Sequence, residues 1–197
     1  MKLFHLQFLL LVSMLVNIPA NQIAAQEIDL DILKSFLEER DSILNSRIGT
    51  PFINFDLTDL TGNQITEKQL QGKVTLINFW FSACAPCVAE FDDLNNLYNG
   101  FKDNSDFQFL SITFDALEDV KESIKKYKLP YTIISTSKKE CGKMNFEQGY
   151  PATIIVDKQG KIRLMHSGGS LEKEKITAQI ETYRQEILKW LKACNVG

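Results

Sequence analysis

The sequence predicts an α/β fold: a mixed β-sheet with helices on both faces, preceded by an N-terminal helical extension. From residue 52 onward, short apolar segments typical of strands alternate with segments whose apolar residues recur at helical spacing. The chain then closes with a strand hairpin and one long helix. Alternating strands and helices favour parallel strands, and the closing hairpin adds an antiparallel one, so the predicted sheet is mixed.

Length and composition are those of one domain with extensions. The chain has 197 residues, of which 44% are hydrophobic and 24% charged, and single cores hold roughly 100–200 residues. The formal net charge is −3, whereas a nucleic-acid-binding surface normally brings a basic excess. We therefore expect no nucleic-acid partner, and the sequence indicates neither a metal nor an organic cofactor.

The first 25 residues are predicted to be a secretory signal peptide. Lys2 is followed by an apolar stretch, Leu3–Ile18, and then by alanines at positions 20, 24 and 25, an order typical of such signals. The stretch contains polar residues and is short for a membrane span, which needs about 20 apolar residues, but an uncleaved signal anchor remains an alternative. We expect the protein to be exported to the periplasm or cell envelope.

Residues 26–47 are predicted to form the helical extension. Apolar residues recur at helical spacing among charges between Glu27 and Ser46, as in an amphipathic helix. Gly49-Thr50-Pro51 ends that helix, and the domain proper is expected to cover residues 48–197.

The elements of the domain are predicted in the order β-β-α-β-α-β-β-α. The second strand is almost continuously apolar, as expected of a buried parallel strand. Asp157-Lys158-Gln159-Gly160 is a hairpin turn signal between the last two strands. The predicted strands are 52–57, 73–81, 107–114, 151–156 and 161–166, and a short segment, Tyr131–Ile134, leads on to the fourth of them. One predicted helix begins after Pro86, and the other two cover 117–127 and 171–192.

Cys84 and Cys87 are the strongest candidates for chemistry. The chain has four cysteines, all after the predicted signal peptide, in a compartment where thiols tend to oxidise. Cys84 falls where a buried strand ends and a helix begins, and the free N–H groups and partial positive charge of a helix N-terminus favour a thiolate there. Pro86 fits the first turn of that helix. Cys87, one turn further in, is placed to resolve a mixed disulfide formed at Cys84.

Two alternatives to redox chemistry depend on partners that the sequence hardly offers. A zinc site would need a second C-x-x-C, which neither Cys141 nor Cys194 completes. A Cys–His protease would need a base, and His166 is the sole histidine after the signal peptide. No metal site is therefore predicted. Cys141 and Cys194 stay open, since each could be a small buried side chain or the two could pair.

From Ile48 to Ser170 the chain resembles the thioredoxin superfamily, and within it the exported TlpA/ResA-like branch. The matching motifs occur in family order at family-like separations. They are Gly49-Thr50-Pro51-Phe52 with Leu57; Gly72-Lys73-Val74-Thr75-Leu76-Ile77-Asn78-Phe79-Trp80; Cys84–Cys87 with Glu90; Gly149-Tyr150-Pro151-Ala152-Thr153; and Asp157–Lys161.

The resemblance implies a thioredoxin-like fold and a thiol–disulfide oxidoreductase whose redox-active disulfide is Cys84–Cys87. It also implies a cis Tyr150–Pro151 bond and a part for Pro151 in catalysis. A cis proline turns the backbone sharply beside the active cysteine and leaves neighbouring backbone groups free to pair with a bound peptide. We therefore expect Tyr150 and Ala152 to bind substrate.

The same resemblance implies the partners. These are exported protein thiols and disulfides, together with a membrane electron donor that would keep the pair reduced. A monomer is expected.

The sequence departs from the family pattern near the cysteines. Ala83 stands where a Trp commonly precedes the first cysteine, which should open the surface around Cys84. Asn78 occupies the strand position where cytoplasmic relatives carry a buried acid, and an amide cannot take a proton from Cys87. Another carboxylate, or water, would have to help.

Asp115 is the candidate for that carboxylate. The strand 107–114 should run parallel to the strand 73–81 by a right-handed crossover, so both end at the same sheet edge, where function usually lies. Asp115 directly follows that end, and exported relatives often carry an acidic residue in this region. A solvated loop acid or a helix N-cap is the alternative.

The predicted function is dithiol–disulfide exchange with exported proteins, with the resemblance favouring a reductant. The direction of electron flow stays open, since potentials in this fold run from about −270 to about −120 mV. One alternative is a thiol peroxidase of the redoxin class. In that class a Thr stands three residues before the peroxidatic Cys. Here Cys84 stands three residues before Cys87, which weakens this alternative. The other is a non-enzymatic copper-binding thioredoxin-like module, which would typically add a distant histidine and a longer cysteine spacing.

Overall fold

The computed structural model describes residues 30–193. The chain divides into two structural units between Ile43 and Leu44. Helix α2 (Leu30–Arg47) begins in the first unit and ends in the second. The predicted signal peptide and Cys194 lie outside the described residues. None of the helices in the described part of the chain is long and apolar enough to cross a membrane.

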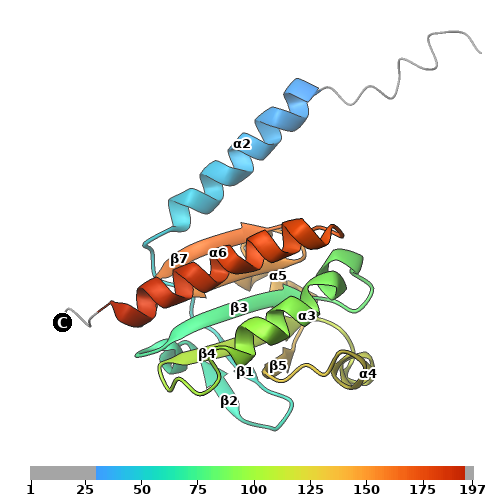
Figure 1. The fold of residues 1–197 in the computed structure, drawn as a ribbon, viewed down its shortest axis with the longest axis vertical. Helices are drawn as coiled ribbons and strands as arrows, with labels where there is room; N and C mark the ends of the chain where they lie inside the picture. Colours follow the sequence, from blue (N-terminus) through green and yellow to red (C-terminus); the bar gives the residue numbers. More distant parts are fainter. Residues whose placement is uncertain (1–29, 194–197) are drawn as a thin grey trace, which may run out of the picture. The chain divides into compact units, whose positions relative to one another are not determined.

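The second unit contains a five-stranded sheet with the strand order β5-β4-β3-β6-β7 (Figure 1). β3 is parallel to β4, and β4 to β5, whereas β6 is antiparallel to both β3 and β7. The predicted mixed sheet is therefore confirmed, as is the parallel crossover between β3 and β4. The strands are β3 (Val74–Trp80), β4 (Phe107–Thr113), β5 (Thr132–Ser135), β6 (Ala152–Val156) and β7 (Ile162–Ser167).

Helices cover both faces of this sheet, as predicted. Side chains of α3, α4 and α6 join one buried cluster with the strands, and side chains of α5 and the short 3-10 helix η3 join the cluster on the other face. Figure 1 shows α3 and α6 next to each other on one face. The helices are η3 (Glu67–Leu70), α3 (Ala85–Asn99), α4 (Leu117–Tyr127), α5 (Lys138–Met144) and α6 (Lys173–Lys192).

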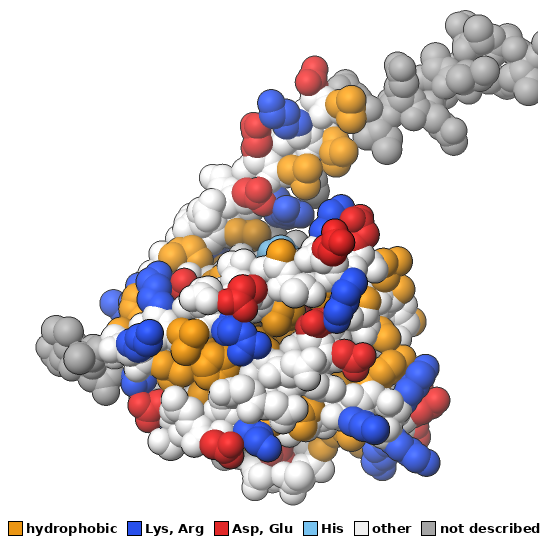
Figure 2. Space-filling view, viewed as in Figure 1, with side chains coloured by type: hydrophobic (Ala, Val, Ile, Leu, Met, Phe, Trp, Pro, Cys, Tyr) orange, Lys and Arg blue, Asp and Glu red, His pale blue; other side chains and the backbone are white. Residues whose placement is uncertain are grey.

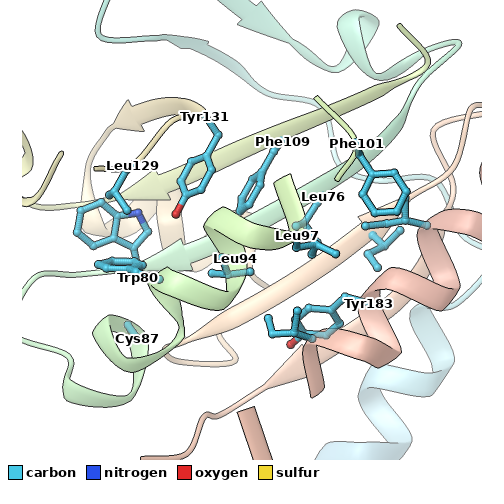
Figure 3. Close-up of a cluster of buried hydrophobic side chains, with 14 of the residues drawn as sticks. Leu76, Trp80, Cys87, Leu94, Leu97, Phe101, Phe109, Leu129, Tyr131 and Tyr183 are labelled. Atoms are coloured by element: carbon cyan, nitrogen blue, oxygen red, sulfur yellow. The ribbon is translucent and has the colours of Figure 1, made fainter. Parts of the chain in front are cut away.

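β3 is the central strand, and it leads directly to the cysteines. All seven of its residues are buried, and its side chains alternate, so that Trp80 faces α3 while Phe79 faces α5. The Trp80 ring packs edge-on against Phe91 with centroids 5.1 Å apart, and its indole N–H donates to Ser111 Oγ at 2.7 Å. Burial of a large apolar side chain contributes roughly 1.5–3 kcal/mol. The cluster in Figure 3 therefore fixes α3 against the strand end from which it starts.

The predicted first strand at 52–57 is wrong. Phe52 and Phe55 are both buried in the cluster on the α5 face, but residues three apart in a strand point to opposite faces. This segment therefore follows an irregular path. The strand that does form is β1 (Asp56–Thr58), which pairs with β2 (Gln64–Thr66) in a separate two-stranded sheet.

Two elements between β4 and β6 are missing from the predicted order: β5, which coincides with the short segment noted at 131–134, and α5. β5 has four residues and α5 seven, too few for a periodicity to emerge. A local signal for α5 was present, because Ser137 and Glu140 have the Ser-x-x-Glu spacing of a capping box. In the structure the Ser137 hydroxyl accepts the backbone N–H of Glu140 at 3.1 Å.

Acidic and basic side chains are interspersed on the surface around α6. Lys175 pairs with Glu172, and Arg184 with Glu181, and Figure 2 shows both signs of charge distributed over this face. Exposed pairs of this kind contribute only about 0–1 kcal/mol each. Neither sign of charge therefore dominates the surface around α6.

Candidate active site

Cys84 and Cys87 form a disulfide bond at the start of α3, with their Cα atoms 5.3 Å apart. Cys84 is the N-cap residue, and its Sγ accepts the backbone N–H of Cys87 at 3.2 Å. Pro86 lies in the first helical turn, where its missing N–H breaks no hydrogen bond. Cys84 is 5% exposed and Cys87 1%. Cys84 is thus the sulfur nearer solvent, at the positive end of the helix dipole.

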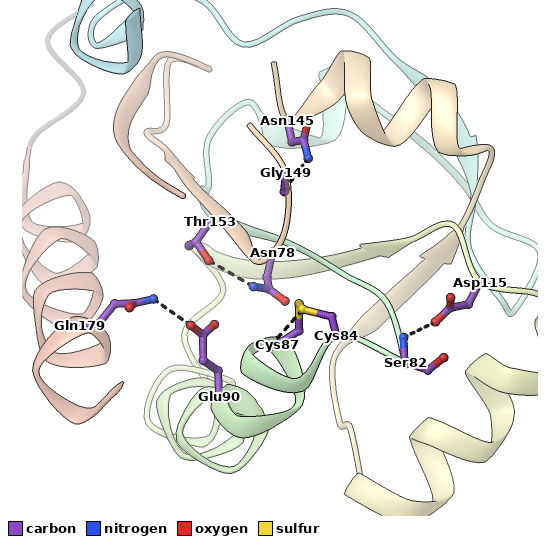
Figure 4. The surroundings of a disulfide bond; sticks show 10 residues. All are labelled: Asn78, Ser82, Cys84, Cys87, Glu90, Asp115, Asn145, Gly149, Thr153 and Gln179. Atoms are coloured by element: carbon purple, nitrogen blue, oxygen red, sulfur yellow. Dashed lines mark hydrogen bonds between the residues drawn. A yellow bond between two sulfur atoms is a disulfide. The ribbon is translucent and has the colours of Figure 1, made fainter. Parts of the chain in front are cut away.

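The loop between β3 and α3 is held by Asp115, which follows β4. Oδ2 of Asp115 accepts the backbone N–H of Ser82 at 2.6 Å (Figure 4), and the backbone carbonyl of Asp115 accepts the hydroxyl of Ser135 at 2.7 Å. Asp115 therefore lies beside the cysteine loop, at the sheet edge where it was expected. One of its carboxylate oxygens is committed to a backbone amide, which is the geometry of a group that positions the loop.

Glu90, one turn after Cys87 on α3, is a second carboxyl group at the pair. Its side chain is fully buried, and Oε1 accepts the side-chain amide of Gln179 on α6 at 3.1 Å. Oε2 has no hydrogen-bond partner within residues 30–193. Burial raises the pKa of Glu90 to about 7, against the Gln179 hydrogen bond, which lowers it, and with a smaller rise from the charge of Asp93. The carboxyl therefore exchanges protons near neutral pH, as a general acid or base must.

In the sequence, Glu90 stands out only as part of a family motif. Helical spacing could have revealed its burial, because Cys87, Glu90, Phe91 and Leu94 fall on one buried face of α3. An acid on such a face has to be neutralised or hydrogen-bonded. Its partner could not be found in this way, since Gln179 is 89 positions further along the chain.

A chain of polar side chains continues from Glu90 toward β3. Gln179 also donates to the hydroxyl of Tyr183 at 2.6 Å, and Tyr183 is hydrogen-bonded to Thr153 on β6. The hydroxyl of Thr153 accepts the side-chain amide of Asn78 at 3.1 Å. Figure 4 shows the Asn78 side chain pointing toward the sulfur atoms. Asn78, which cannot accept a proton, therefore lies beside the Cys84–Cys87 disulfide. The carboxyl group of Glu90 is at the other end of this series of hydrogen bonds.

The Tyr150–Pro151 peptide bond is cis, the geometry that the resemblance implies. The Tyr150 ring lies 5.5 Å from that of Phe81 and 5.2 Å from that of Phe114, measured between centroids. All three side chains are only partly buried. Half-buried aromatic rings from three separate segments therefore border the loop that carries Cys84.

Gly169, in the loop between β7 and α6, closes the site beside Pro151. A Cβ atom at this position would lie 2.7 Å from Pro151 Cγ, 2.9 Å from Glu90 Oε1 and 3.1 Å from Pro86 Cβ. These distances bring together the cis-proline loop, the buried carboxyl and the first turn of α3. A side chain at position 169 would displace at least one of them, so the close approach of this loop to Glu90 depends on the glycine.

Three other residues were considered from the sequence. Ala152 directly follows Pro151, and its side chain is 2% exposed in the cluster on the α5 face, so a substrate contact at this position would use its backbone groups. His166 lies on β7 with its ring 6.0 Å from that of Tyr183. Cys141 is a free, buried thiol on α5 whose pKa is raised by burial to about 11, which makes it a poor nucleophile. Within residues 30–193, no group of three His, Cys, Asp or Glu side chains could hold a metal ion.

Known proteins share this sequence pattern. Residues 48–165 match the family model described as the AhpC/TSA family. The thiol-disulfide oxidoreductase ResA of Bacillus cereus (strain ZK / E33L) is 32% identical over 143 residues, which are 72% of this chain and 79% of the relative. The protein of the same name from Halalkalibacterium halodurans is 28% identical over 128 residues, 64% of this chain and 72% of the relative.

Solved structures share the fold. The thioredoxin domain of a thiol-disulfide oxidoreductase from Bacteroides vulgatus has a TM-score of 0.57 at 28% identity, and the match covers 69% of this chain and 96% of that structure. A thiol:disulfide interchange protein from Bacteroides sp. has a TM-score of 0.56 at 27% identity, covering 70% of this chain and 90% of that structure. The thioredoxin-like fold expected from the sequence is confirmed.

Proposed function

This chain belongs to the AhpC/TSA family of thioredoxin-like proteins and is a thiol–disulfide oxidoreductase, and from that premise we propose that it exchanges a Cys84–Cys87 dithiol/disulfide with exported protein substrates. One observation carries the proposal. Two bonded sulfurs lie at a helix N-terminus, one nearer solvent and the other one turn before a buried carboxyl that titrates near neutrality. This arrangement offers an attacking thiol at Cys84, a resolving thiol at Cys87 and, at Glu90, a carboxyl group that can accept the proton of Cys87.

In the direction of substrate reduction, the thiolate of Cys84 attacks one sulfur of a substrate disulfide. A bond forms between Cys84 Sγ and that sulfur, and the second substrate sulfur leaves as a thiolate that takes a proton from solvent. Cys87 then loses its thiol proton and attacks Cys84 Sγ. The Cys84–Cys87 disulfide forms, the first substrate sulfur leaves with a proton, and two electrons have passed from the pair to the substrate.

The proton of Cys87 is assigned to Glu90. Residues three apart on a helix are neighbours, and Oε2 of Glu90 has no partner in the described part of the chain. Above about pH 7 the carboxylate is available to accept the thiol proton, and below it the group is protonated. The same carboxyl can return the proton to the departing substrate sulfur. Asp115 is proposed to act through the Ser82 amide, as a positioning residue for the cysteine loop.

Substrate is proposed to lie over the cis-proline loop. Tyr150 and its aromatic neighbours offer an apolar border to the cysteine loop, and Ala83 is exposed and small, so it leaves the approach to Cys84 open. Pro151 and Glu90 both lie next to position 169. An extended substrate segment with an apolar side chain beside its cysteine fits this surface.

The cellular setting is proposed from the sequence. Residues 1–25 would direct export to the periplasm or cell envelope, with a signal-anchored form if they are retained. Residues 26–47 would be a helical extension of the catalytic domain, 48–197. In this compartment the protein would work as a monomeric reductant, and a membrane electron donor would reduce the pair again after each cycle.

A thiol peroxidase is the second candidate, because the AhpC/TSA match also fits that class. One peroxide oxygen would then oxidise the Cys87 thiolate to a sulfenic acid while the other leaves as water or alcohol. The Cys84 thiol would condense with the sulfenic acid, which forms the Cys84–Cys87 disulfide and releases a second water. The smaller exposure of Cys87, 1% against 5% for Cys84, favours exchange over this scheme. Peroxide consumption that survives Cys84→Ser would favour the peroxidase.

The proposal is tested by expressing Cys87→Ser in the cell envelope. Without the resolving thiol, Cys84 should stay covalently joined to the substrates it attacks, and turnover should be lost. Non-reducing gels should then show discrete high-mass species that collapse with dithiothreitol. Cys84→Ser is the matched control and should form none, whereas Cys141→Ser and Cys194→Ser in the Cys87→Ser background should leave the species in place. Adducts that persist without Cys84 but vanish without Cys141 or Cys194 would overturn the assignment.

A further inference from the structure

Helix α6 turns one amide side chain toward the active site. Gln179 lies between Ile176 and Ile180, which are buried, and one turn before Tyr183, which is buried as well. An amide in such surroundings is costly unless its N–H groups are hydrogen-bonded. The partners of Gln179 therefore indicate what the amide does.

Both protons of the Gln179 amide are used. Nε2 donates to Glu90 Oε1 at 3.1 Å and to the Tyr183 hydroxyl at 2.6 Å, and an amide nitrogen has two protons to give. Tyr183 is in turn bonded to Thr153 on the sheet. The amide is therefore anchored from the sheet side, and turning away from Glu90 would break the bond to Tyr183 too.

This anchoring selects one orientation of the Glu90 carboxyl group. The last torsion of a glutamate is broad, so an unbound carboxyl group would rotate over a wide range of planes. With Oε1 held by Gln179, Oε2 is the oxygen that lacks a partner in residues 30–193. Figure 4 shows Gln179 on one side of Glu90 and Cys87 on the other.

We propose that Gln179 is a positioning residue of the exchange reaction: by binding Oε1 it holds the carboxyl group of Glu90 with Oε2 turned toward Cys87. The inference rests on the proposed function, in which Glu90 takes the proton of Cys87. It extends the site to a residue of α6 that touches neither sulfur nor substrate.

The charged surroundings of Glu90 determine the direction of the expected effect. The ionisable groups around it are Cys87 and Asp93 on α3, Lys173 paired with Asp93 at the start of α6, Tyr183 on α6, and His166 on β7 packed against Tyr183. Burial and the charge of Asp93 raise the pKa of Glu90, and the Gln179 hydrogen bond lowers it. Removing that bond should therefore raise the pKa of Glu90 further.

Gln179→Met tests this, because it removes the donor and keeps the length of the side chain. The rate at which a mixed disulfide is released, measured in single turnovers against pH, should have its midpoint raised by about half to one pH unit. Gln185→Met is the matched control, since Gln185 lies on the same helix and donates to the exposed Glu181; its midpoint should equal that of the wild type. A purely structural role for Gln179 would lower stability without moving the midpoint.

A second measurement needs no turnover. The ¹³C NMR shift of the Glu90 carboxyl carbon, followed against pH in the oxidised protein, should show the same upward shift in Gln179→Met. Gln179→Glu, which places a second carboxyl group against Oε1, should move the midpoint further and replaces the Met variant if that one fails to fold. If the wild type releases no mixed disulfide, the proposed function fails. If it does, and the variants keep the wild-type midpoint in both measurements, the role of Gln179 is refuted.

Discussion

Two carboxyl groups flank the cysteine pair, one on the β4 side and one on the α6 side. Asp115 keeps part of its surface exposed and binds the backbone amide of Ser82 with one oxygen. Glu90 is fully buried, binds Gln179 with one oxygen and leaves the other without a partner among the described residues. The sequence shows only that both are acidic residues near the cysteines, whereas the structure places them in different surroundings.

The difference teaches that two carboxyl groups near one cysteine pair can be suited to different roles. A carboxylate bound to a backbone amide is suited to fixing that backbone. A carboxyl taken out of water, with one oxygen free, has its affinity for protons raised toward the pH at which thiols react. Glu90 meets the second description, and the expectations below are arranged to separate the two groups.

The largest expected effect is on stability, and it concerns Glu90→Gln in the oxidised protein. Glu90 has an ordinary pKa of 4.5 and a folded-state pKa of about 7, so the folded protein binds more protons between these values. The stabilisation from this extra proton binding is fully present below pH 4.5 and is lost as the pH rises through 7. Between pH 5 and pH 8 the wild type should therefore lose free energy of unfolding that Glu90→Gln keeps, a difference on the order of 3 kcal/mol.

Urea unfolding of both oxidised proteins at pH 5 and pH 8 measures this gain. An Asp115→Asn variant serves as the control, because it removes a charge beside the cysteine loop and leaves the buried carboxyl of Glu90 in place. Parallel pH dependences in the wild type and Glu90→Gln would show that the carboxyl is not buried as described.

The next effect concerns Gly169, which lies next to both Pro151 and Glu90. Gly169→Ala would bring a methyl group within 2.7 Å of Pro151 Cγ and 2.9 Å of Glu90 Oε1. Overpacking of this kind costs about 1–3 kcal/mol, and a displaced carboxyl should slow release of the mixed disulfide about tenfold. Thermal unfolding and single-turnover release measure the two effects. A variant with wild-type stability and kinetics would mean that the glycine does not confine Glu90.

The smallest effects separate charge from hydrogen bonding at Asp115. Asp115→Asn keeps an oxygen that can accept the Ser82 amide, so its exchange rate should stay within about threefold of the wild type. Asp115→Ala leaves that amide unpaired and should cost about 1–3 kcal/mol, with slower attack by Cys84. An Asn variant that releases substrate as slowly as the Ala variant, with an altered pH profile, would restore Asp115 as a base.

The sequence could predict those parts of the molecule that depend on local pattern. The apolar run of β3, the helix that starts at Cys84 and the parallel crossover to β4 follow from periodicity and chain order. Phe52 and Phe55 were misplaced, because strand propensity is local whereas their burial in one cluster is set by the whole fold.

The division of labour between the carboxyl groups lay beyond the sequence for the same reason. Asp115 was predicted because strand order alone brings it to the right edge. The proton-accepting role proposed for Glu90 depends on burial and on contacts with α6 and Gly169, which come from distant parts of the chain. A chain position can indicate proximity, but desolvation depends on everything that packs around the group.

The central claim is that Glu90, and not Asp115, takes the proton of Cys87. Its most direct test is the rate of mixed-disulfide release from Cys84 against pH, in the wild type, Glu90→Gln and Asp115→Asn. In the wild type and Asp115→Asn the rate should rise through about pH 7. Glu90→Gln should lose that rise and be slower at pH 8 by on the order of 100-fold. A rise near pH 7 that persists in Glu90→Gln but disappears in Asp115→Asn would contradict the claim.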